Sequence, residues 1–217
     1  MTQILYSYIN KENHDQLVKE VGSVFSIEFQ RKILKYRRWQ DMQLSLLGRF
    51  LLKKGIEERG EEFCENSIKY TQYNKPYFDE QQVRFNISHS GDIVICALTD
   101  TNDVGIDIEK QHDIRIEDFK SQMTIGEWKR ITSSRDIRTS FFEYWTQKEA
   151  VIKAHGMGLS IPLKSFEIIN SYTRVNNDSF FLKEIKLDNE YKCHIACANK
   201  IGLSLSNPKI VNPFVNI

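Results

Sequence analysis

The sequence has no excess of charge of either sign. Its 217 residues include 30 Lys and Arg against 29 Asp and Glu, which gives a formal net charge of +1. A protein that binds nucleic acid or an anionic membrane through its overall charge carries a clear positive excess. We therefore expect no nucleic-acid or membrane partner, and any basic site must be local.

Long apolar runs are missing as well. Residues 1–10 lack the basic start and the apolar stretch of a signal peptide. No apolar run approaches the length of about 20 residues that a membrane helix needs. With 41% hydrophobic and 27% charged residues, the composition is that of a globular protein with a sizeable core. We expect a cytoplasmic location.

Cysteine is scarce, with four residues at positions 64, 96, 193 and 197. A cytosolic chain keeps such thiols reduced, so we expect Cys64, Cys96, Cys193 and Cys197 to be core residues. Cys193, His194 and Cys197 lie within five residues, and these residue types are common metal ligands. However, Cys193 and Cys197 lie on one face of an expected strand, and no second Cys/His pair with zinc spacing exists. A structural role is favoured.

Apolar periodicity predicts an α+β protein in which a strand, helices and further strands follow one another twice. In the first half, the expected strands are Ile4–Ile9, Ser67–Tyr73, Val83–Ser88 and Ile93–Leu98, and the expected helices are Asp15–Val21, Phe29–Tyr36 and Asp41–Ile56. In the second half, the expected strands are Val104–Ile108, Phe166–Ile169, Phe180–Ile185, Tyr191–Ala198 and Leu203–Leu205, around a helical region at Glu127–His155. The polar stretch at 100–103 predicts a division into residues 1–102 and 103–217. The sequence has no residue-level repeat at a fixed period.

Two short charged runs indicate chemistry. In Gly-Ile-Asp-Ile-Glu, interpreted as a strand, Asp107 and Glu109 project from one face, and carboxylates about 6.5 Å apart can share a divalent ion. In the run that begins at Trp145, interpreted as a helix, Glu149 and Lys153 are neighbours at i and i+4. Carboxylate ligands favour magnesium, which leaves positions for water and phosphate. Taken singly, each pair is better explained as a solvated strand end or a surface helix pair.

Five segments around these runs follow one another in a recognisable order. They are Asn74–Pro76, Phe85–Ser90, Val104–Glu109, Phe141–Lys153 and Gly156–Ser160. Together they resemble the 4′-phosphopantetheinyl transferase family, of the surfactin-synthetase-activating type. The resemblance implies an α+β fold of two similar halves that form an intramolecular pseudo-dimer, with the active site between them.

The resemblance also implies an activity. Such an enzyme acts as a monomer and transfers the 4′-phosphopantetheine group of coenzyme A to a serine of an apo acyl or peptidyl carrier protein, which releases adenosine 3′,5′-bisphosphate. By this resemblance, Asp107, Glu109 and Glu149 hold Mg²⁺ against the pyrophosphate, and Lys153 supplies a second positive charge. Either Glu149 or a metal-bound water deprotonates the carrier serine, and we favour Glu149.

Further matching positions imply contacts with coenzyme A. Ser88 and His89 match positions that touch its phosphates, with His89 on the 3′-phosphate, although a structural histidine is the rival interpretation. Lys75 and Pro76 are expected near the adenine and the phosphates. Asn74 stands where glycine is usual in the family, and asparagine tolerates the positive φ that this turn needs.

A second departure concerns the 3′-phosphate. Leu44 stands where the family usually has an arginine, and Lys32 and Arg38 are expected to compensate. A run of basic residues such as this one is more often a solvated face.

Other matching residues surround the catalytic helix. Glu127 either is structural or shapes the magnesium site. Phe141, Phe142 and Trp145 are expected to be core residues that seat the helix, because aromatic residues at helical spacing usually pack inside. Gly156 and Gly158 are expected to end the helix, and an acidic carrier helix is expected to dock near Met123–Arg130.

Two functions of other classes remain as alternatives. A magnesium-dependent phosphodiester hydrolase could use the same three acids, and a non-catalytic coenzyme A-binding module could keep the fold. Neither alternative explains the five ordered segments.

Overall fold

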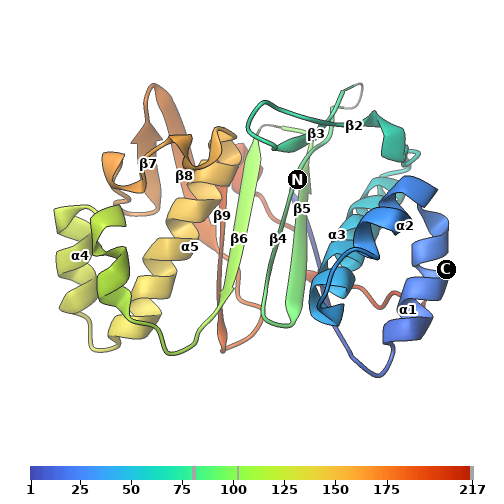
Figure 1. The fold of residues 1–217 in the computed structure, drawn as a ribbon. Helices are drawn as coiled ribbons and strands as arrows, with labels where there is room; N and C mark the ends of the chain where they lie inside the picture. The colour runs from blue at the N-terminus through green and yellow to red at the C-terminus, as the bar shows by residue number, and fades with distance from the viewer. Residues whose placement is uncertain (80–81, 102, 216–217) are drawn as a thin grey trace.

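The computed structural model describes residues 1–79, 82–101 and 103–215. Figure 1 shows two sheets in the middle of the molecule, with helices on the outer side of each. The first sheet has the order β10-β1-β5-β4 and the second the order β6-β9-β8-β7. The layers therefore run helix, sheet, sheet, helix.

The first half contributes most of one sheet and its helices. Its strands are β1 (Gln3–Tyr8), β2 (Ile68–Tyr70), β3 (Pro76–Phe78), β4 (Arg84–Ser90) and β5 (Ile93–Thr99), and its helices are α1 (His14–Glu20), α2 (Ile27–Ile33) and α3 (Trp39–Glu58). Strands β2 and β3 form a separate hairpin. The turn between them contains Asn74 at φ +62°, so the predicted positive φ at this asparagine is confirmed.

The second half repeats the plan. Its helices are α4 (Ile125–Thr132) and α5 (Ile137–His155), and its strands are β6 (Val104–Lys110), β7 (Tyr172–Val175), β8 (Asp178–Glu184) and β9 (Tyr191–Cys197). A final strand, β10 (Lys209–Ile210), pairs in parallel with β1 and so belongs to the first sheet. The division at residues 102 and 103 stays a prediction, and Asn102 lies outside the described residues.

The helical region predicted at Glu127–His155 is confirmed and consists of two helices with a turn at residues 133–136 between them. Two predicted strands of the second half were wrong in detail. The run Phe166–Ile169 is not a strand. Its alternation reflects burial of Phe166 and Ile168, whose backbone groups bond to buried side chains of α4 and α5. The run Leu203–Leu205 begins at the end of a 3₁₀ turn, and only an isolated bridge joins its last residue to Thr2.

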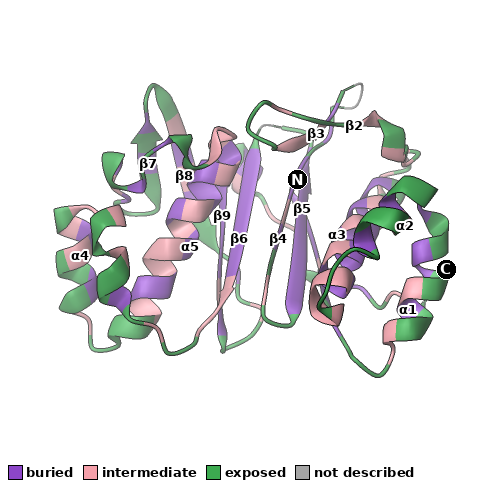
Figure 2. Cartoon of the chain, in the orientation of Figure 1, coloured by how far each residue is buried: buried purple, intermediate pink, exposed green. Residues whose placement is uncertain are grey.

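Apolar residues form a core in each half and another core between the sheets. The inter-sheet core includes Ile93 and Ile95 of β5 together with Ile106 and Ile108 of β6. Figure 2 shows these central strands buried and the outer helix faces exposed. The two halves therefore bury apolar surface against each other.

Strands β4 and β6 meet along this junction through side chains. Three side chains of β4 accept hydrogen bonds from alternate backbone N–H groups of β6. The pairs are Asn86 with Ile106 at 2.9 Å, Ser88 with Ile108 at 3.4 Å, and Ser90 with Lys110 at 3.1 Å. Side chains thus satisfy backbone donors that a neighbouring strand would otherwise pair.

Helix α5 lies directly against β6. A Cβ atom at Gly105 would lie 2.0 Å from the Ala150 carbonyl oxygen, so the glycine permits this close approach. Asp136 caps the start of α5, and Gly156 ends it at φ +86°, which confirms the predicted stop at Gly156.

The aromatic residues of α5 pack as predicted. Phe141 and Phe142 are buried, and Trp145 packs partly buried against them. The prediction for cysteine was correct at Cys96, Cys193 and Cys197, which are buried. It was wrong at the fourth residue, Cys64, which is exposed because it lies in the irregular segment between α3 and β2. Within the described ranges, no helix combines the length and the apolar composition that a membrane crossing requires.

Candidate active site

An acidic cluster lies where β6 faces α5. Ile106 and Ile108 are fully buried in the core, and Asp107 and Glu109 alternate with them, as the sequence predicted. Asp107 is only 3% exposed. Such burial of a carboxylate is costly unless a cation or hydrogen-bond donors compensate it, so its surroundings carry information about function.

Groups from both halves surround the two carboxylates. The Lys153 ammonium lies 2.6 Å from Oδ1 of Asp107 and donates to the Ser88 hydroxyl at 2.9 Å. The Ser88 hydroxyl in turn donates to the same oxygen of Asp107 at 3.0 Å, and the Ser90 hydroxyl donates to Glu109 at 2.7 Å. Strand β4 of the first half therefore holds the acids of the second half in place.

The three acidic side chains repel one another. Burial raises the pKa of Asp107, although Lys153 opposes the shift. Burial also raises the pKa of Glu109, and the charge of Asp107 adds to the effect. For Glu149, burial is again the main cause of a raised pKa, followed by the charges of Asp107 and Glu109. The single ammonium of Lys153 does not balance three carboxylates, so the cluster keeps an excess of negative charge.

The donor set fits a magnesium ion. Oδ2 of Asp107 is buried and accepts no hydrogen bond from the described residues, and carboxylate oxygens are ligands that Mg²⁺ prefers. In the described ranges, however, no three acidic, histidine or cysteine side chains already form a group that could hold a metal. Lys153 contacts the other oxygen of Asp107 instead. The metal role of Asp107, Glu109 and Glu149 therefore stays a prediction.

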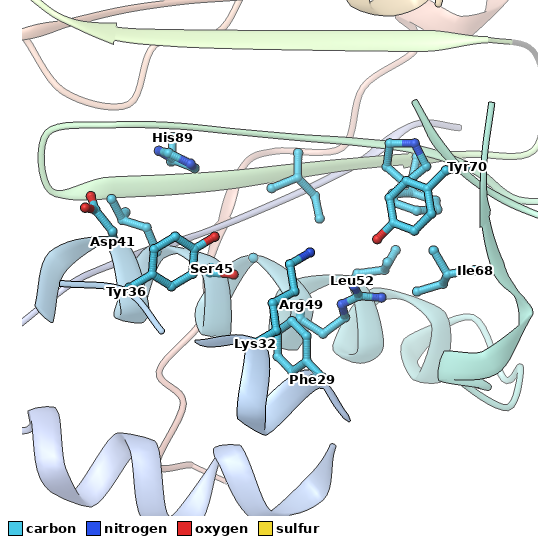
Figure 3. A pocket seen from close by; sticks show the side chains of 15 residues that line it. Phe29, Lys32, Tyr36, Asp41, Ser45, Arg49, Leu52, Ile68, Tyr70 and His89 are labelled. Atoms are coloured by element: carbon cyan, nitrogen blue, oxygen red, sulfur yellow. The ribbon is translucent and has the colours of Figure 1, made fainter. Parts of the chain in front are cut away.

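A cavity of about 350 Å³ lies on the other face of β4 (Figure 3). Helices α2 and α3, the β2–β3 hairpin and β4 form its walls. Phe29, Tyr70 and His89 line it together with two cations, Lys32 and Arg49. Since successive residues of a strand point to opposite faces, Ser88 faces the acidic cluster while His89 faces this cavity. Partial burial, followed by the charge of Lys153, lowers the pKa of His89.

The structure separates the residues that were predicted to bind coenzyme A. Pro76, His89 and Lys32 line the cavity. Lys75 is turned away from it, and its ammonium donates to the Ala154 carbonyl at 2.8 Å, near the end of α5. Arg38 is exposed, lies 4.0 Å from Asp41, and is not among the residues that line the cavity.

Two family models match consecutive parts of the chain. Residues 12–101 match the model described as 4′-phosphopantetheinyl transferase, N-terminal, and residues 103–198 match that of the 4′-phosphopantetheinyl transferase superfamily. The chain is 32% identical over 202 residues to the 4′-phosphopantetheinyl transferase gsp of Aneurinibacillus migulanus. These residues are 89% of this chain and 84% of that protein. The chain belongs to this transferase family.

Other transferases of the family are similar to the chain. The 4′-phosphopantetheinyl transferase Sfp of Bacillus subtilis is 31% identical over 189 residues, which are 82% of this chain and 84% of that protein. A Xenopus laevis relative, an L-aminoadipate-semialdehyde dehydrogenase-phosphopantetheinyl transferase, is 26% identical over 215 residues, which are 84% of this chain and 71% of that protein. The predicted family and its α+β fold of two similar halves are thereby confirmed.

Glu127 of this transferase is a structural residue. It and Lys148 are both 0% exposed, and the Lys148 ammonium lies 2.9 Å from Oε2 of Glu127. Lys148 also donates to the carbonyls of Leu163 and Phe166 at 2.8 Å, and Glu127 accepts from the Ile168 N–H at 3.1 Å. The pair therefore joins α4, α5 and the segment after α5.

Two residues of this transferase were not predicted from the sequence. Lys148 lies in the charged run that begins at Trp145, but its burial was not predicted, because lysine is usually a surface residue. Arg49 lies one turn after Ser45 and one turn before Leu52 on α3, and all three line the cavity. This spacing along one helix face was the signal that could have identified Arg49.

Proposed function

We propose that this chain transfers the 4′-phosphopantetheine group of coenzyme A to a serine of an apo acyl or peptidyl carrier protein and releases adenosine 3′,5′-bisphosphate. Membership of the transferase family supports the activity. The observation that carries the proposal is the partly buried contact of Lys153 with Asp107 and Ser88, which brings an acid, a cation and a hydroxyl from both halves together.

The residues of the cluster suggest how the reaction proceeds. The serine oxygen of the carrier forms a bond to the phosphorus next to the pantetheine arm, and the bridging P–O bond of the pyrophosphate breaks. Lys153 binds the pyrophosphate and stabilises negative charge on the leaving bisphosphate. Glu149 accepts the serine proton as the general base. Asp107, Glu109 and Glu149 would hold Mg²⁺, which supplies positive charge at the pyrophosphate when bound.

Intact mass spectrometry tests this proposal directly. An apo carrier protein, coenzyme A and Mg²⁺ are mixed with the wild-type chain, and the carrier should gain the mass of one phosphopantetheine. The Glu149→Gln variant and a chelator should each abolish the gain. Glu143→Gln, six residues earlier on α5, is the matched control and should retain it.

The other possible outcomes identify the alternative functions. Cleavage of coenzyme A without modification of several carriers would favour a phosphodiester hydrolase. Binding of coenzyme A without any product would favour a non-catalytic binding module.

We place the carrier docking surface on α4, within the predicted segment Met123–Arg130. Ile125 is 92% exposed, and Lys129 lies exposed one turn further along the same helix. An apolar side chain beside a cation complements an amphipathic helix with acidic residues. Met123 and Glu127 are buried and serve the core instead.

Steady-state kinetics test this surface. Lys129→Glu and Ile125→Ser should raise the KM for the carrier and leave the KM for coenzyme A unchanged. Ile201→Ser removes an exposed isoleucine that lies outside this surface and is the control. An unchanged carrier KM in both α4 variants would rule out this surface.

We further propose a monomer in the cytoplasm, where coenzyme A and apo carriers meet. A monomer suffices because one chain contributes both β4 and β6 to the cluster. Light scattering after size exclusion tests the oligomeric state.

A further inference from the structure

Ser90, the last residue of β4, holds the side chain of Glu109 through a hydroxyl with two partners. Its oxygen accepts a hydrogen bond from the Lys110 N–H at 3.1 Å, and its proton goes to Oε2 of Glu109 at 2.7 Å. A serine hydroxyl has one proton, so the backbone N–H on one side leaves that proton for the carboxylate on the other. A hydrogen bond to a charged carboxylate is stronger than one between neutral groups. Ser90 therefore restricts Glu109, although the two residues belong to different halves.

The same arrangement occurs two residues earlier on both strands, which Figure 1 shows side by side at the junction of the halves. Ser88 accepts from the backbone N–H that follows Asp107 and donates to Oδ1 of that acid at 3.0 Å. Asn86 accepts from the N–H that follows Gly105, where β6 has no side chain. A serine thus stands opposite each acid, and the position without an acid carries an asparagine. The serine hydroxyls therefore serve the acids as well as the edge of β6.

Each of the two acids keeps one carboxylate oxygen free of hydrogen bonds. Within the described ranges, Oδ2 of Asp107 and Oε1 of Glu109 accept none. Asp107 also contacts Lys153, whereas Glu109 has no ion pair among the described residues. Magnesium requires near-ideal octahedral geometry from few carboxylates, so the direction of each carboxylate matters. The direction of Glu109 depends on Ser90.

Resting on the proposed function, we propose that Ser90 is a positioning residue of the metal site, which holds the carboxylate of Glu109 in the direction that binds Mg²⁺ and so sets the affinity for the ion. Residues that orient metal ligands by hydrogen bonds typically have this effect. Ser88 has the same arrangement, but it also accepts from Lys153. Ser90 is therefore the position at which the effect can be measured separately.

The decisive measurement is the affinity for Mn²⁺, which prefers the same oxygen ligands as Mg²⁺ and has a paramagnetic resonance signal. The ion is titrated into the chain with coenzyme A, and coenzyme A alone is the blank. Ser90→Ala should raise the Kd for Mn²⁺ about 10-fold, and Ser90→Thr, which keeps the hydroxyl, should retain a Kd close to that of the wild type. Ser7→Ala is the matched control, because it removes a buried serine hydroxyl of the same sheet that donates to the Val211 carbonyl at 3.0 Å. It should leave the Kd unchanged.

Steady-state kinetics distinguish a positioning residue from a catalytic or purely structural one. Because a high ion concentration compensates a weaker site, Ser90→Ala should need about 10-fold more Mg²⁺ for half-maximal rate and keep most of the wild-type kcat at saturating Mg²⁺. Circular dichroism checks the folding of each variant. If Ser90→Ala does not fold, Ser90→Cys, whose thiol is a weak donor, takes its place with the same expectation.

An unchanged Kd for Mn²⁺ in the folded variant would overturn the proposal, and so would a kcat that saturating Mg²⁺ does not restore. The titration also separates this inference from the proposed function, because it requires no carrier protein. If the wild-type chain modifies no carrier but binds Mn²⁺ in a way that depends on Ser90, the proposed activity fails and the positioning role stands. If the chain modifies carriers but wild type and Ser90→Ala bind Mn²⁺ equally, or neither binds it, the activity stands and the positioning role fails.

Discussion

At the scale of single residues, Lys153 is the cation that compensates the negative charge of the acidic cluster. It is the only basic side chain in ion-pair contact with Asp107 among the described residues. In the proposed reaction the same ammonium also stabilises the leaving bisphosphate. Loss of its charge should therefore affect turnover more than folding.

We expect Lys153→Ala to lower kcat about 100- to 1,000-fold, as removal of one electrostatic stabiliser does in other enzymes. The rate of carrier modification at saturating substrates measures this effect. Lys164→Ala, an exposed lysine after α5, is the control and should keep the wild-type kcat. A Lys153→Ala variant that keeps the wild-type kcat would exclude a catalytic role.

His194 provides a second test at residue scale, through the pH dependence of stability. Burial lowers the pKa of His194 from 6.5 to about 4, Glu184 raises it in part, and Lys192 lowers it further. Its ring bonds to the hydroxyl of Thr146 at 2.8 Å. Because its folded pKa lies below its unfolded pKa, the unfolded state binds more protons between these values, and stability falls as the pH drops through this window.

The contribution of this histidine between pH 7 and pH 4.5 is about 2–3 kcal/mol. His194→Gln should remove that part of the loss, so its unfolding free energy should depend less on pH than that of the wild type. Urea denaturation at both pH values measures the difference. Equal pH dependence in the two proteins would show that folding does not lower the pKa of His194.

At the scale of elements, the buried pair of Lys148 and Glu127 fixes α4 and α5 to each other. Both charges are removed from water, and five polar contacts compensate them: the ion pair, two carbonyls at Lys148 and two N–H groups at Glu127. Removal of one partner leaves the other charge buried and unpaired.

We therefore expect Lys148→Met to lower the unfolding free energy by about 3–5 kcal/mol. The double variant Lys148→Met with Glu127→Leu should lose less than the two single losses combined, because neither charge remains. Arg138→Ala, which breaks the exposed contact with Asp113, should cost less than about 1 kcal/mol. Urea titrations of the wild type, the two single variants, the double variant and Arg138→Ala decide the matter, and additive losses in the double variant would contradict the pairing.

Strong local patterns allowed much of this element structure to be predicted from sequence. The long helix α3 and strands such as β5 and β9 have clear periodicity, and the i, i+2 spacing of Asp107 and Glu109 predicted their shared face. Strands β3 and β10 are too short for a periodic pattern, with three and two residues. Other features could not be predicted because they depend on tertiary contacts. The segment at Phe166 bonds to buried side chains, and Arg49 packs against the ring of Phe29 on another helix.

At the scale of the whole molecule, the core between the sheets makes the two halves one cooperative structure. Ile93 and Ile95 of one half pack with Ile106, Ile108 and Ile195 of the other. Separation of the halves would expose this apolar face to water together with the edges of β4 and β6.

The full chain should accordingly unfold in a single transition that circular dichroism and tryptophan fluorescence report at the same urea concentration. Fragments of residues 1–102 and 103–217, expressed separately, should show no cooperative transition. Two separate transitions in the full chain, or a cooperatively folded fragment, would show that the inter-sheet core contributes little.

The parallel pairing of β10 with β1 has a consequence for the order of events during synthesis. Strand β1 emerges from the ribosome first, yet its outer neighbour is at residues 209–210. Until those residues have been synthesised, β1 is an unpaired sheet edge and Val211 is missing from the core of the first half. Folding of the first half is therefore completed only after the second half has left the ribosome, although its other strands are synthesised first.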